Sequence, residues 1–467
     1  MLGNGITARL CACRCTVDDA DDDLSAVGEQ NYPILHNIRK MQERVIEMSD
    51  KQKLIIKGGR RLEGEIAVQG AKNSALPLLA AAVLCHGETV LYNCPRLTDC
   101  NAACRILTSL GCGCRREGGA VSIHTEAINS TEISGALMRE MRSSIIFMGA
   151  LLGRFGSCRL SFPGGCEIGA RPIDFHVAAF RKMGAEIKEE HGYLNCTARK
   201  LKGARISLPL PSVGATENII LAAVLAEGIT EIHNAAKEPE ISDLAAFLIR
   251  CGAKIRGQGT ETVIIEGVKS LNGCEYTIMP DRIAAATYLC CTAITRGEII
   301  LSKSDFRSLG LIVPVLEQTG CSIYSFGRDS IYLNARHSLK APSSIRTAPH
   351  PGFPTDAQPP VMAYCTTLKG TTIFVETIFE NRYRHVSELT RLGAKINVEG
   401  RVAVVEGADR LSGAELEATD LRGGAALVTA GLFAEGTTKI GNSGYIYRGY
   451  EDIVGNLRRL GADIRNM

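Results

Sequence analysis

The stretch "PGGCEIGAR", residues 163–171, places the thiol of Cys166 five positions before the guanidinium of Arg171. It follows a strand-like run, Leu160–Phe162, and its two adjacent glycines favour an exposed loop because they order poorly and pack little. A nearby cation favours the thiolate, which is the nucleophilic form of cysteine. Cys166 is therefore a candidate reactive group. The alternative, an idle or packed thiol among eighteen cysteines, stays open.

Polar and basic residues also gather where six helices are expected to begin. Most of these junctions place Ser, Thr, Asp or Asn at the expected N-cap, and four of the six have Lys or Arg beside it. Helix N-termini carry unsatisfied N–H groups and partial positive charge, so several that converge would bind an anion. The alternative is that each cluster only caps its own helix. The junctions are residues 69–76, 138–145, 211–218, 279–286, 353–360 and 418–425.

The elements around these junctions repeat six times. A helix that ends in an apolar residue, a glycine with a small partner and then a strand recur with a period of about seventy residues, as in "LTSLGCGC", "FRKMGAEI" and "LRRLGADI". The repeated glycines are Gly111, Gly184, Gly252, Gly320, Gly393 and Gly461.

A second set of glycines ends six alanine-rich helical runs in the same register. At the C′ position glycine supplies the left-handed turn that closes a helix, and strand-like segments follow. Each unit is therefore predicted to contain a strand, a helix, a strand, a helix and further strands. These glycines are Gly87, Gly156, Gly228, Gly297, Gly370 and Gly436.

The composition indicates a soluble globular α/β protein. The 467 residues are 45% hydrophobic and 22% charged, which allows two or three domains or one repeated architecture. A net charge of +3 is too small to indicate nucleic-acid or membrane binding. The eighteen cysteines lack the spacing of a disulfide framework and suggest reduced thiols of a cytosolic protein. No apolar run predicts a membrane span or a signal peptide.

The first fifty residues differ from the rest. "CACRC" precedes the acidic run "DDADDD", a composition typical of a disordered extension or a start assigned too early. Cys11, Cys13 and Cys15 leave a metal-binding tract open as an alternative, although they have no partner cluster.

Several long motifs resemble one enzyme family. "GAKNSALPLLAA", "PGGCEIGARPIDFH", "SVGATEN", "APHPGFPTDAQ", "ETIFENRYRHV" and "RGYE" are similar to motifs of the UDP-N-acetylglucosamine 1-carboxyvinyltransferases, from about residue 53 to the C-terminus. The related transferases that act on shikimate 3-phosphate share the six repeats but lack the loop cysteine. A catalytically silent paralogue that binds the nucleotide sugar and regulates the pathway stays open.

The resemblance implies an α/β fold of two domains, each an inside-out α/β barrel of three repeats with helices in its centre, joined by a double crossover. Residues 51–71 and 281–467 would form one domain, residues 72–280 the second domain with the cysteine loop, and residues 1–50 the extension. Ligands would lie between the domains.

It also implies a reaction, the first committed step of peptidoglycan synthesis. The enolpyruvyl group of phosphoenolpyruvate moves to the 3′-hydroxyl of UDP-N-acetylglucosamine, and phosphate leaves, with no metal and no organic cofactor. Such chemistry needs a proton donor for C3 of the enol, an acceptor for the hydroxyl proton and cations for the anionic substrates.

The catalytic roles come from the resemblance, position by position. Cys166 would donate the proton to C3, form the phosphothioketal adduct with phosphoenolpyruvate and react with fosfomycin. Lys72 and Asn73 would bind phosphoenolpyruvate, Arg448 would meet its carboxylate, and Asp356 would stand beside the sugar hydroxyl. For Asp356 the alternative role is a helix N-cap.

The remaining roles concern the nucleotide sugar and the surrounding ion pairs. A leucine replaces the lysine that some members have at 210, and "GYIYRGY" lacks the His and acidic residue that often precede the arginine. Asp420 and Arg422 resemble residues near the reacting centre, while Glu380, Arg382, Asp281 and Arg282 are expected to tie loops and the hinge together. The predicted nucleotide-sugar contacts are Arg142, Arg171, Pro172, Ile173, Asp174, Phe175, Leu210, Pro211, Ser212, Val213, Asp356 and Ile378.

Overall fold

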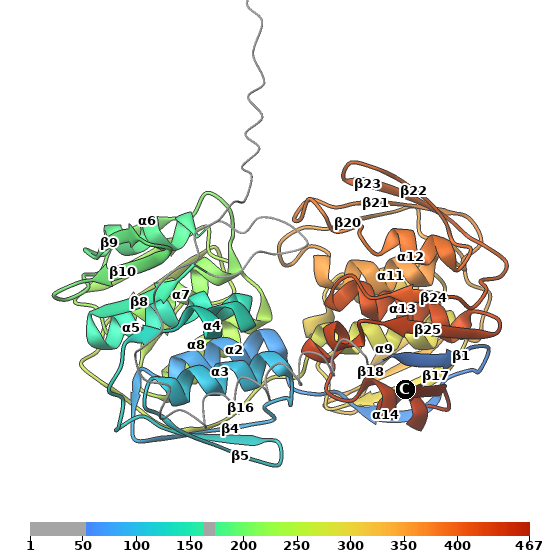
Figure 1. The fold of residues 1–467 in the computed structure, drawn as a ribbon. Helices are drawn as coiled ribbons and strands as arrows, with labels where there is room; N and C mark the ends of the chain where they lie inside the picture. Colours follow the sequence, from blue (N-terminus) through green and yellow to red (C-terminus); the bar gives the residue numbers. More distant parts are fainter. Residues whose placement is uncertain (1–52, 163–172) are drawn as a thin grey trace, which may run out of the picture. The chain divides into compact units, whose positions relative to one another are not determined.

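The computed structural model describes residues 53–162 and 173–467, which form six four-stranded sheets around buried helices (Figure 1). Every sheet has the same strand pattern. An edge strand runs parallel to the second strand, the second strand is antiparallel to the third, and the third is antiparallel to the fourth. The predicted order of strand, helix, strand, helix and two strands is therefore confirmed, for example from β7 to β10.

Three sheets use strands between residues 88 and 277. Their orders are β16 (Glu275–Thr277), β4 (Glu88–Tyr92), β6 (Ala120–His124), β5 (Gly113–Glu117); β7 (Glu132–Ile133), β8 (Ser157–Ser161), β10 (Tyr193–Thr197), β9 (Glu186–Glu190); and β11 (Arg205–Ser207), β12 (Ile229–His233), β14 (Thr262–Glu266), β13 (Lys254–Arg256). A small parallel pair joins β15 (Leu271–Asn272) to β3 (Cys85–His86).

The other three sheets use strands from residues 54–67 and 298–466. Their orders are β2 (Glu63–Ala67), β17 (Glu298–Ser302), β19 (Ser330–Asn334), β18 (Ser322–Phe326); β20 (Ser344–Arg346), β21 (Thr371–Val375), β23 (Val402–Glu406), β22 (Lys395–Glu399); and β24 (Glu415–Glu417), β25 (Thr437–Gly441), β1 (Leu54–Lys57), β26 (Asp463–Asn466). In the last sheet, β1 takes the third position, so the sixth unit is completed by the beginning of the described chain.

One helix of each unit packs inside. These inner helices are α2 (Lys72–Ala82), α5 (Phe147–Phe155), α7 (Val213–Ala223), α9 (Arg282–Ile294), α11 (Gln358–Cys365) and α13 (Leu421–Phe433). Every residue of α9 and α11 is buried. Small residues permit this packing: a Cβ at Gly149 would lie 2.2 Å from the carbonyl oxygen of Asn218 on the neighbouring helix.

The remaining helices are shorter or more amphipathic. The second helices of the units are α3 (Thr98–Ser109), α6 (Asp174–Lys182), α8 (Pro239–Arg250), α10 (Ile312–Gln318), α12 (Val386–Arg391) and α14 (Ile453–Arg459). The others are α4 (Gly135–Glu140) and the 3₁₀ turns η1 (Arg142–Ile146), η2 (Arg307–Leu309), η3 (Thr355–Ala357) and η4 (Ser443–Arg448).

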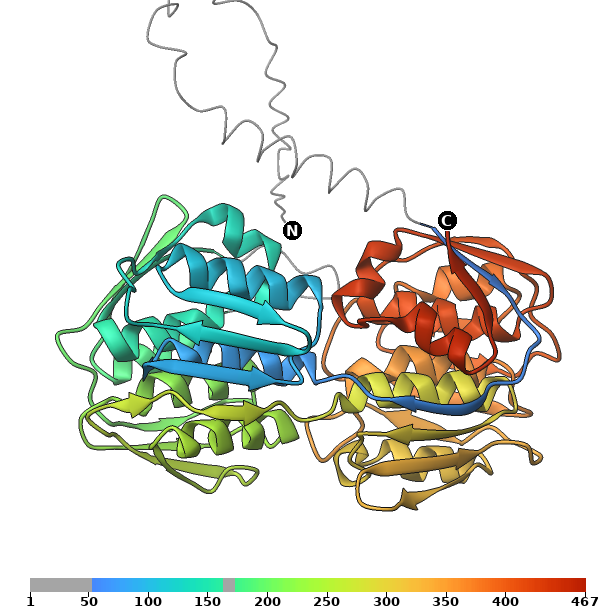
Figure 2. The ribbon, with the colours of Figure 1, turned by 90° about the horizontal axis from the view of Figure 1, so that it is seen from below.

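The chain crosses twice between the two groups of sheets. Strand β2 pairs with β17 in the second group of sheets, and the chain then enters α2 in the first group. Strand β16 pairs with β4 in the first group, and the chain then enters α9 in the second group. The two crossing segments lie side by side (Figure 2) because Ala71 N donates to Met279 O at 2.8 Å and Asp281 N to Gln69 O at 2.9 Å. This is the double crossover that the resemblance implies.

The glycine predictions are partly wrong. All six glycines of the first set have positive φ, as expected for the turn after a helix. In the second set only Gly156 directly ends its helix; the other inner helices end before their glycines, which occupy the turn into the next strand. At Gly297 the positive φ belongs to Arg296. Glycine is needed there for another reason: a Cβ would lie 2.1 Å from the carbonyl oxygen of Leu62.

The capping prediction also needs correction. Side chains cap three of the six inner helices, at Ser212, Asp281 and Asp420. Helix α2 begins after Ala71, which has no capping side chain. Instead, the backbone N–H of Lys72 donates to Asp281 Oδ2 at 3.1 Å, so one aspartate serves the starts of two helices.

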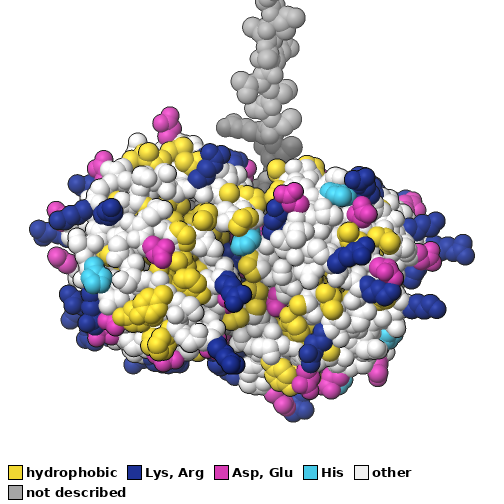
Figure 3. Space-filling model, turned by 180° about the vertical axis from the view of Figure 1, so that it is seen from behind, with side chains coloured by type: hydrophobic (Ala, Val, Ile, Leu, Met, Phe, Trp, Pro, Cys, Tyr) yellow, Lys and Arg dark blue, Asp and Glu magenta, His cyan; other side chains and the backbone are white. Residues whose placement is uncertain are grey.

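The described surface carries mixed charge. On the face shown in Figure 3, basic and acidic side chains are interspersed, in keeping with the small net charge of the sequence. Within residues 53–162 and 173–467, the helices are too short or too polar to cross a bilayer. The fourteen cysteines in these ranges are free thiols.

Candidate active site

Lys72 stands at the first position of α2 with its ammonium group almost buried. Its Nζ lies 2.6 Å from Asp99 Oδ2, and the two side chains are 11% and 3% exposed. The N-terminal end of an inner helix thus presents a cation whose position is fixed from both sides, by Asp99 at the side chain and by Asp281 at the backbone. Asn73, the next residue, is exposed.

Arg448 ends η4 and reaches the same carboxylate. Its Nε and Nη2 donate to the two oxygens of Asp99 at 3.0 and 3.4 Å. The sequence "GYIYRGY" lacks the His and the acidic residue that often precede this arginine. Asp99, 349 positions away in the sequence, supports Arg448 instead. Lys72 and Arg448, both predicted to bind phosphoenolpyruvate, meet at Asp99.

Asp99 is the residue that the sequence analysis missed. It lies in the first turn of α3, where an acidic residue is common because it interacts favourably with the helix N-terminus. Burial would raise its pKa, but the charges of Lys72 and Arg448 outweigh burial and hold the pKa below the usual 3.8. The carboxylate stays ionised and orients both cations.

Asp356 lies in η3, immediately before α11, and two arginines hold it. Arg382 Nη2 donates to Oδ1 at 3.0 Å, and Arg422 Nη2 donates to Oδ2 at 3.4 Å. The carboxylate is 28% exposed, whereas the arginine side chains are only 1% and 3% exposed. The N-cap residues of η3 and α11 are Pro354 and Ala357, so Asp356 occupies neither N-cap position.

Arg422, which contacts Asp356, lies in the first turn of α13 and is itself held by neighbouring groups. Asp420 caps this helix by accepting from the N–H groups of Arg422 and Gly423, each at 3.0 Å. The Nη1 of Arg422 donates to the hydroxyl of Tyr450 at 3.1 Å, and its buried Nε has no hydrogen-bond partner among the described residues. Burial disfavours the charge of Arg422, but Tyr450 and Asp356 raise its pKa above the usual value.

The expected ties between loops are confirmed in part. Arg282 in α9 and Glu240 in α8, which lie on either side of the second crossing, form a buried ion pair with Nε 2.9 Å from Oε1. Glu380 pairs with Arg401 at the surface. Arg382 does tie loops, since it donates twice to Thr355 O, but it also contacts Asp356 and thus belongs to the candidate site.

The predicted nucleotide-sugar residues within the described ranges lie at the starts of α6 and α7 and after β21. Ser212 caps α7 by accepting from Ala215 N at 3.4 Å, and Ile378 N donates to Glu376 Oε1 at 2.8 Å. Leu210 is 64% exposed, so it does not pack in the interior. Ile173, Asp174 and Phe175 begin α6, and Pro211 and Val213 flank Ser212. Cys166, Arg171 and Pro172 lie outside the described residues, as does the side chain of Arg142.

This arrangement can bind an anion and accept a proton. Lys72 at the start of α2 and Arg448 share one buried carboxylate, Asp99 in the first turn of α3, and a more exposed carboxylate between two arginines precedes α11. Among the described residues, no group of three or more His, Cys, Asp or Glu side chains is placed to hold a metal ion.

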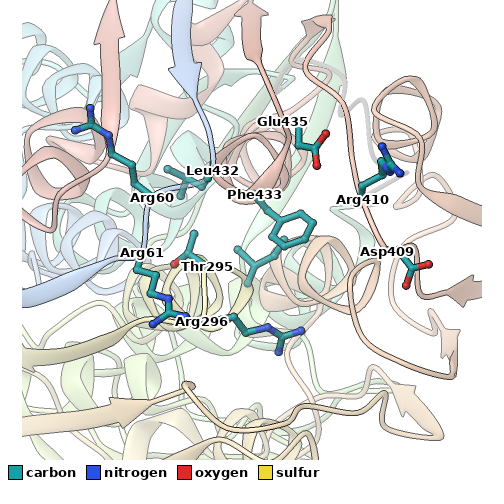
Figure 4. Close-up of a pocket in the computed structure, with 11 residues that line it drawn as sticks. Arg60, Arg61, Thr295, Arg296, Asp409, Arg410, Leu432, Phe433 and Glu435 are labelled. Carbon is teal, nitrogen blue, oxygen red and sulfur yellow. The ribbon is translucent and has the colours of Figure 1, made fainter.

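A separate cavity of about 270 Å³ lies at the other ends of α9 and α13 (Figure 4). The site residues Arg282 and Arg422 begin these helices, and a helix of 13 residues is about 20 Å long, so the cavity is distinct from the candidate site. Its charged lining residues are Arg60, Arg61, Arg296, Asp409, Arg410 and Glu435.

Comparisons with known proteins identify the family and agree with the fold. A family profile described as EPSP synthase (3-phosphoshikimate 1-carboxyvinyltransferase) matches residues 56–457. The solved enolpyruvyl transferase NikO from Streptomyces tendae has a TM-score of 0.81 and 26% identity, covering 89% of this chain and 99% of that one. An EPSP synthase from Acinetobacter baumannii, at 19% identity and a TM-score of 0.70, covers the same shares and shows the shared fold.

The curated relatives are more similar in sequence. UDP-N-acetylglucosamine 1-carboxyvinyltransferase 2 of Caldanaerobacter subterraneus subsp. tengcongensis is 51% identical over 412 residues, which are 88% of this chain and 99% of the relative. The protein of the same name from Carboxydothermus hydrogenoformans is 47% identical, over 89% of this chain and 99% of the relative. At this identity and coverage, the chain belongs to the UDP-N-acetylglucosamine 1-carboxyvinyltransferase family.

Proposed function

We propose that this enzyme transfers the enolpyruvyl group of phosphoenolpyruvate to the 3′-hydroxyl of UDP-N-acetylglucosamine and releases phosphate, at the first committed step of peptidoglycan synthesis. The observation that carries the proposal is the convergence of Lys72 and Arg448 on Asp99. One buried carboxylate neutralises only one of the two positive charges, so the pair retains a net positive charge for a small anion.

Phosphoenolpyruvate binds to these cations. Lys72 and Arg448 donate hydrogen bonds to its phosphate and carboxylate groups, and Asn73, exposed beside Lys72, adds a neutral donor. Because Asp99 already holds the two cations in place, little side-chain ordering is needed when the substrate arrives. The cations also stabilise the charge that moves onto phosphate as it leaves.

Two protons move during the transfer. Cys166 gives a proton to C3 of the enol, and Asp356 accepts the proton of the sugar hydroxyl as its oxygen attacks C2. The position of Asp356 supports its role, because its carboxylate is partly exposed and lies between two buried arginines. Cys166 also forms the phosphothioketal adduct.

The nucleotide sugar binds along the starts of α6 and α7 and at Ile378. The exposed side chain of Leu210 and the half-buried segment from Pro211 to Val213 provide apolar surface and backbone groups there. Arg142, Arg171 and Pro172 to Phe175 complete this set in the proposal.

We also propose the domain division 51–71 plus 281–467, and 72–280, with residues 1–50 as a dispensable extension. Two separate hydrophobic clusters support it: one contains residues between 75 and 278, and the other contains residues from 54–68 and 284–464. A protein that begins at Met48 is expected to fold and to turn over normally.

Phosphate release tests the function. The full chain should release phosphate from phosphoenolpyruvate with UDP-N-acetylglucosamine and not with shikimate 3-phosphate. Binding of the nucleotide sugar without any phosphate release would instead indicate a regulatory paralogue.

Cys166 has its own test. Cys166→Ser should abolish turnover and keep nucleotide-sugar binding, because a hydroxyl lacks the acidity and nucleophilicity of a thiol. Cys166→Asp should retain activity and resist fosfomycin. Failure of fosfomycin to label the wild-type protein in the presence of the nucleotide sugar would contradict the role of Cys166.

A further inference from the structure

Gln69, in the first of the two crossing segments, contacts the segment that follows Arg448. Its side-chain Nε2 donates to Gly449 O at 3.0 Å, and its Oε1 accepts from Glu451 N at 2.7 Å. These partners lie 380 and 382 positions away in the sequence. One side-chain amide therefore holds the backbone on both sides of Tyr450.

The two partners fix the orientation of the Gln69 amide. A backbone carbonyl oxygen only accepts hydrogen bonds, and a backbone N–H group only donates them. Nε2 must therefore face Gly449 O and Oε1 must face Glu451 N, because the reversed amide would make neither bond. Position 69 thus needs a donor and an acceptor side by side, which glutamine supplies and an ionised glutamate does not.

The backbone that Gln69 holds begins directly after Arg448. Arg448 is the last residue of η4, and Gly449 follows it. The Nε and Nη2 of Arg448 donate to the two oxygens of Asp99, whose side chain is 3% exposed. A pairing through two hydrogen bonds depends on the position and direction of the guanidinium. The hydrogen bond from Gln69 to Gly449 O restricts both, because it fixes the adjoining backbone.

Tyr450 connects the same segment to the second carboxylate of the site. Its side chain is fully buried, and its hydroxyl lies 2.8 Å from Thr287 Oγ1 and accepts from Arg422 Nη1 at 3.1 Å. Arg422 in turn donates to Asp356. Thr287, Arg422 and the surrounding core therefore hold Tyr450 without Gln69. Loss of the Gln69 side chain should act on Arg448 more than on the group around Asp356.

A separate hydrogen bond holds the backbone of Gln69. Its carbonyl oxygen accepts from Asp281 N in the second crossing at 2.9 Å. Asp281 also accepts from the backbone N–H of Lys72, three positions after Gln69. These contacts do not involve the side chain of Gln69. Replacement of that side chain should therefore leave the crossing and the start of α2 in place.

We propose that Gln69 is a positioning residue for phosphoenolpyruvate binding, because its side-chain amide holds the backbone of residues 449–451 and thereby orients the guanidinium of Arg448. This inference rests on the proposed function, in which Arg448 binds phosphoenolpyruvate. It adds a neutral residue of the first crossing to the charged groups at Asp99. Gln69 acts through Arg448 and needs no contact with the substrate.

Two variants of the full-length protein test the proposal. Gln69→Met keeps a long side chain and removes both hydrogen bonds, whereas Gln69→Glu keeps the acceptor and turns a carboxylate oxygen toward Gly449 O. Titration calorimetry should show that phosphoenolpyruvate binds about fivefold more weakly to Gln69→Met, the scale of one net hydrogen bond, and more weakly still to Gln69→Glu. UDP-N-acetylglucosamine affinity and the melting temperature should stay near the wild-type values. Gln318→Met, at an exposed position of α10, is the matched control.

A double-mutant cycle identifies the residue through which Gln69 acts. In an Arg448→Ala background, Gln69→Met should weaken phosphoenolpyruvate binding less than about twofold, because no guanidinium is left to orient. In a Lys72→Ala background the effect should remain about fivefold, although Lys72 is much closer to Gln69 in the sequence. A general loss of stability would not produce this contrast.

Three results would overturn the proposal. They are wild-type affinity for phosphoenolpyruvate in both Gln69 variants, an effect that persists undiminished without Arg448, and equal weakening of the two substrates. Because binding is measured directly, the outcome does not depend on turnover. A chain that shows the expected pattern but releases no phosphate would contradict the proposed transferase activity and still support the role of Gln69. A wild-type chain that binds no phosphoenolpyruvate would contradict both.

Discussion

Two carboxylates of the candidate site each lie between two cations but differ in exposure. Asp99 lies between Lys72 and Arg448, and Asp356 lies between Arg382 and Arg422. Asp99 is 3% exposed and its cations are more exposed than it is, at 11% and 36%. Asp356 reverses this order: it is 28% exposed and its arginines are 1% and 3% exposed.

The difference assigns opposite roles to the two carboxylates. A buried carboxylate whose cations are more exposed than it is positions those cations for a ligand, whereas a carboxylate that is more exposed than its cations is itself available to a ligand. We infer that Asp99 is a positioning residue and that Asp356 meets the substrate. The same pair of charges can therefore build an anion-binding group or a proton acceptor, depending on which partner faces outward.

Replacement of Asp356 should produce the largest effect. Asp356→Asn keeps the shape and removes the proton acceptor, so turnover should fall about 10²-fold or more while the melting temperature changes little. Phosphate release and nucleotide-sugar affinity are measured together. Asp463→Asn, which changes an exposed aspartate paired with Arg60, is the matched control and should turn over normally. Near-normal turnover of Asp356→Asn would place the proton acceptor elsewhere.

Loss of either cation at Asp99 should mainly affect phosphoenolpyruvate. Lys72→Ala or Arg448→Ala removes charged hydrogen bonds worth about 1.5–3 kcal/mol, which corresponds to a weakening of roughly 10- to 150-fold. Nucleotide-sugar affinity should change far less, as titration calorimetry can determine. Arg336→Ala, which breaks surface pairs with Glu63 and Glu298, is the control. Equal weakening of both substrates would indicate misfolding instead.

Replacement of Asp99 should have a smaller effect of the same kind. Asp99→Asn retains one hydrogen-bond acceptor but loses the charge that holds both cations, so phosphoenolpyruvate affinity should fall by about 1 kcal/mol, roughly fivefold. The proton-transfer step should be unaffected once the substrate is bound. A loss of turnover at saturating substrate as large as that of Asp356→Asn would contradict the division of roles.

The sequence allowed the fold to be predicted because the repeats carry local signals. The glycine after each second helix needs a positive φ, and all six first-set glycines have it. Gly297 shows the limit: its necessity comes from the carbonyl of Leu62, more than 230 positions away, and no local pattern reports such a contact. The N-cap of α2 was mispredicted because its hydrogen-bond acceptor is also distant in sequence. Asp281, in the second crossing, accepts from the backbone N–H of Lys72.

The candidate site was predicted unevenly. Lys72, Arg448 and Asp356 follow from motif resemblance, and the structure places each beside charged partners. Asp99 was missed because it resembles any acidic residue in the first turn of a helix. Its role, which is to bridge Lys72 and Arg448, depends on contacts with residues 27 and 349 positions away. Arg382 was interpreted only as a loop tie, because its contact with Asp356 joins the segment between β21 and α12 to η3, and the local sequence carries no signal for that contact.

The two regions should also differ in how they respond to mild acid, which gives the smallest expected effect. Near Asp356, burial lowers the pKa of His385 to about 4, and the repulsion from Arg382 adds to burial while Asp420 opposes it. An unfolded histidine has a pKa of about 6.5, so below that pH the unfolded chain binds a proton that the folded chain excludes. The stability that His385 contributes is complete above about pH 6.5 and is lost progressively toward pH 4. Asp99, whose pKa is lowered below 3.8, does not titrate in this window.

Chemical denaturation at pH 7.5 and pH 6 measures the difference. The His385 contribution to the loss of unfolding free energy over this interval should be about 1 kcal/mol. His385→Leu should remove that part of the pH dependence, because leucine has no proton to bind and the two ring nitrogens of His385 have no hydrogen-bond partner among the described residues. Asp99→Asn should leave the pH dependence over this interval unchanged, because the pKa of Asp99 is lowered below 3.8. If His385→Leu retained the full wild-type pH dependence, the acid sensitivity would have to reside in another buried group, of which His176 is the first candidate because burial also lowers its pKa to about 4.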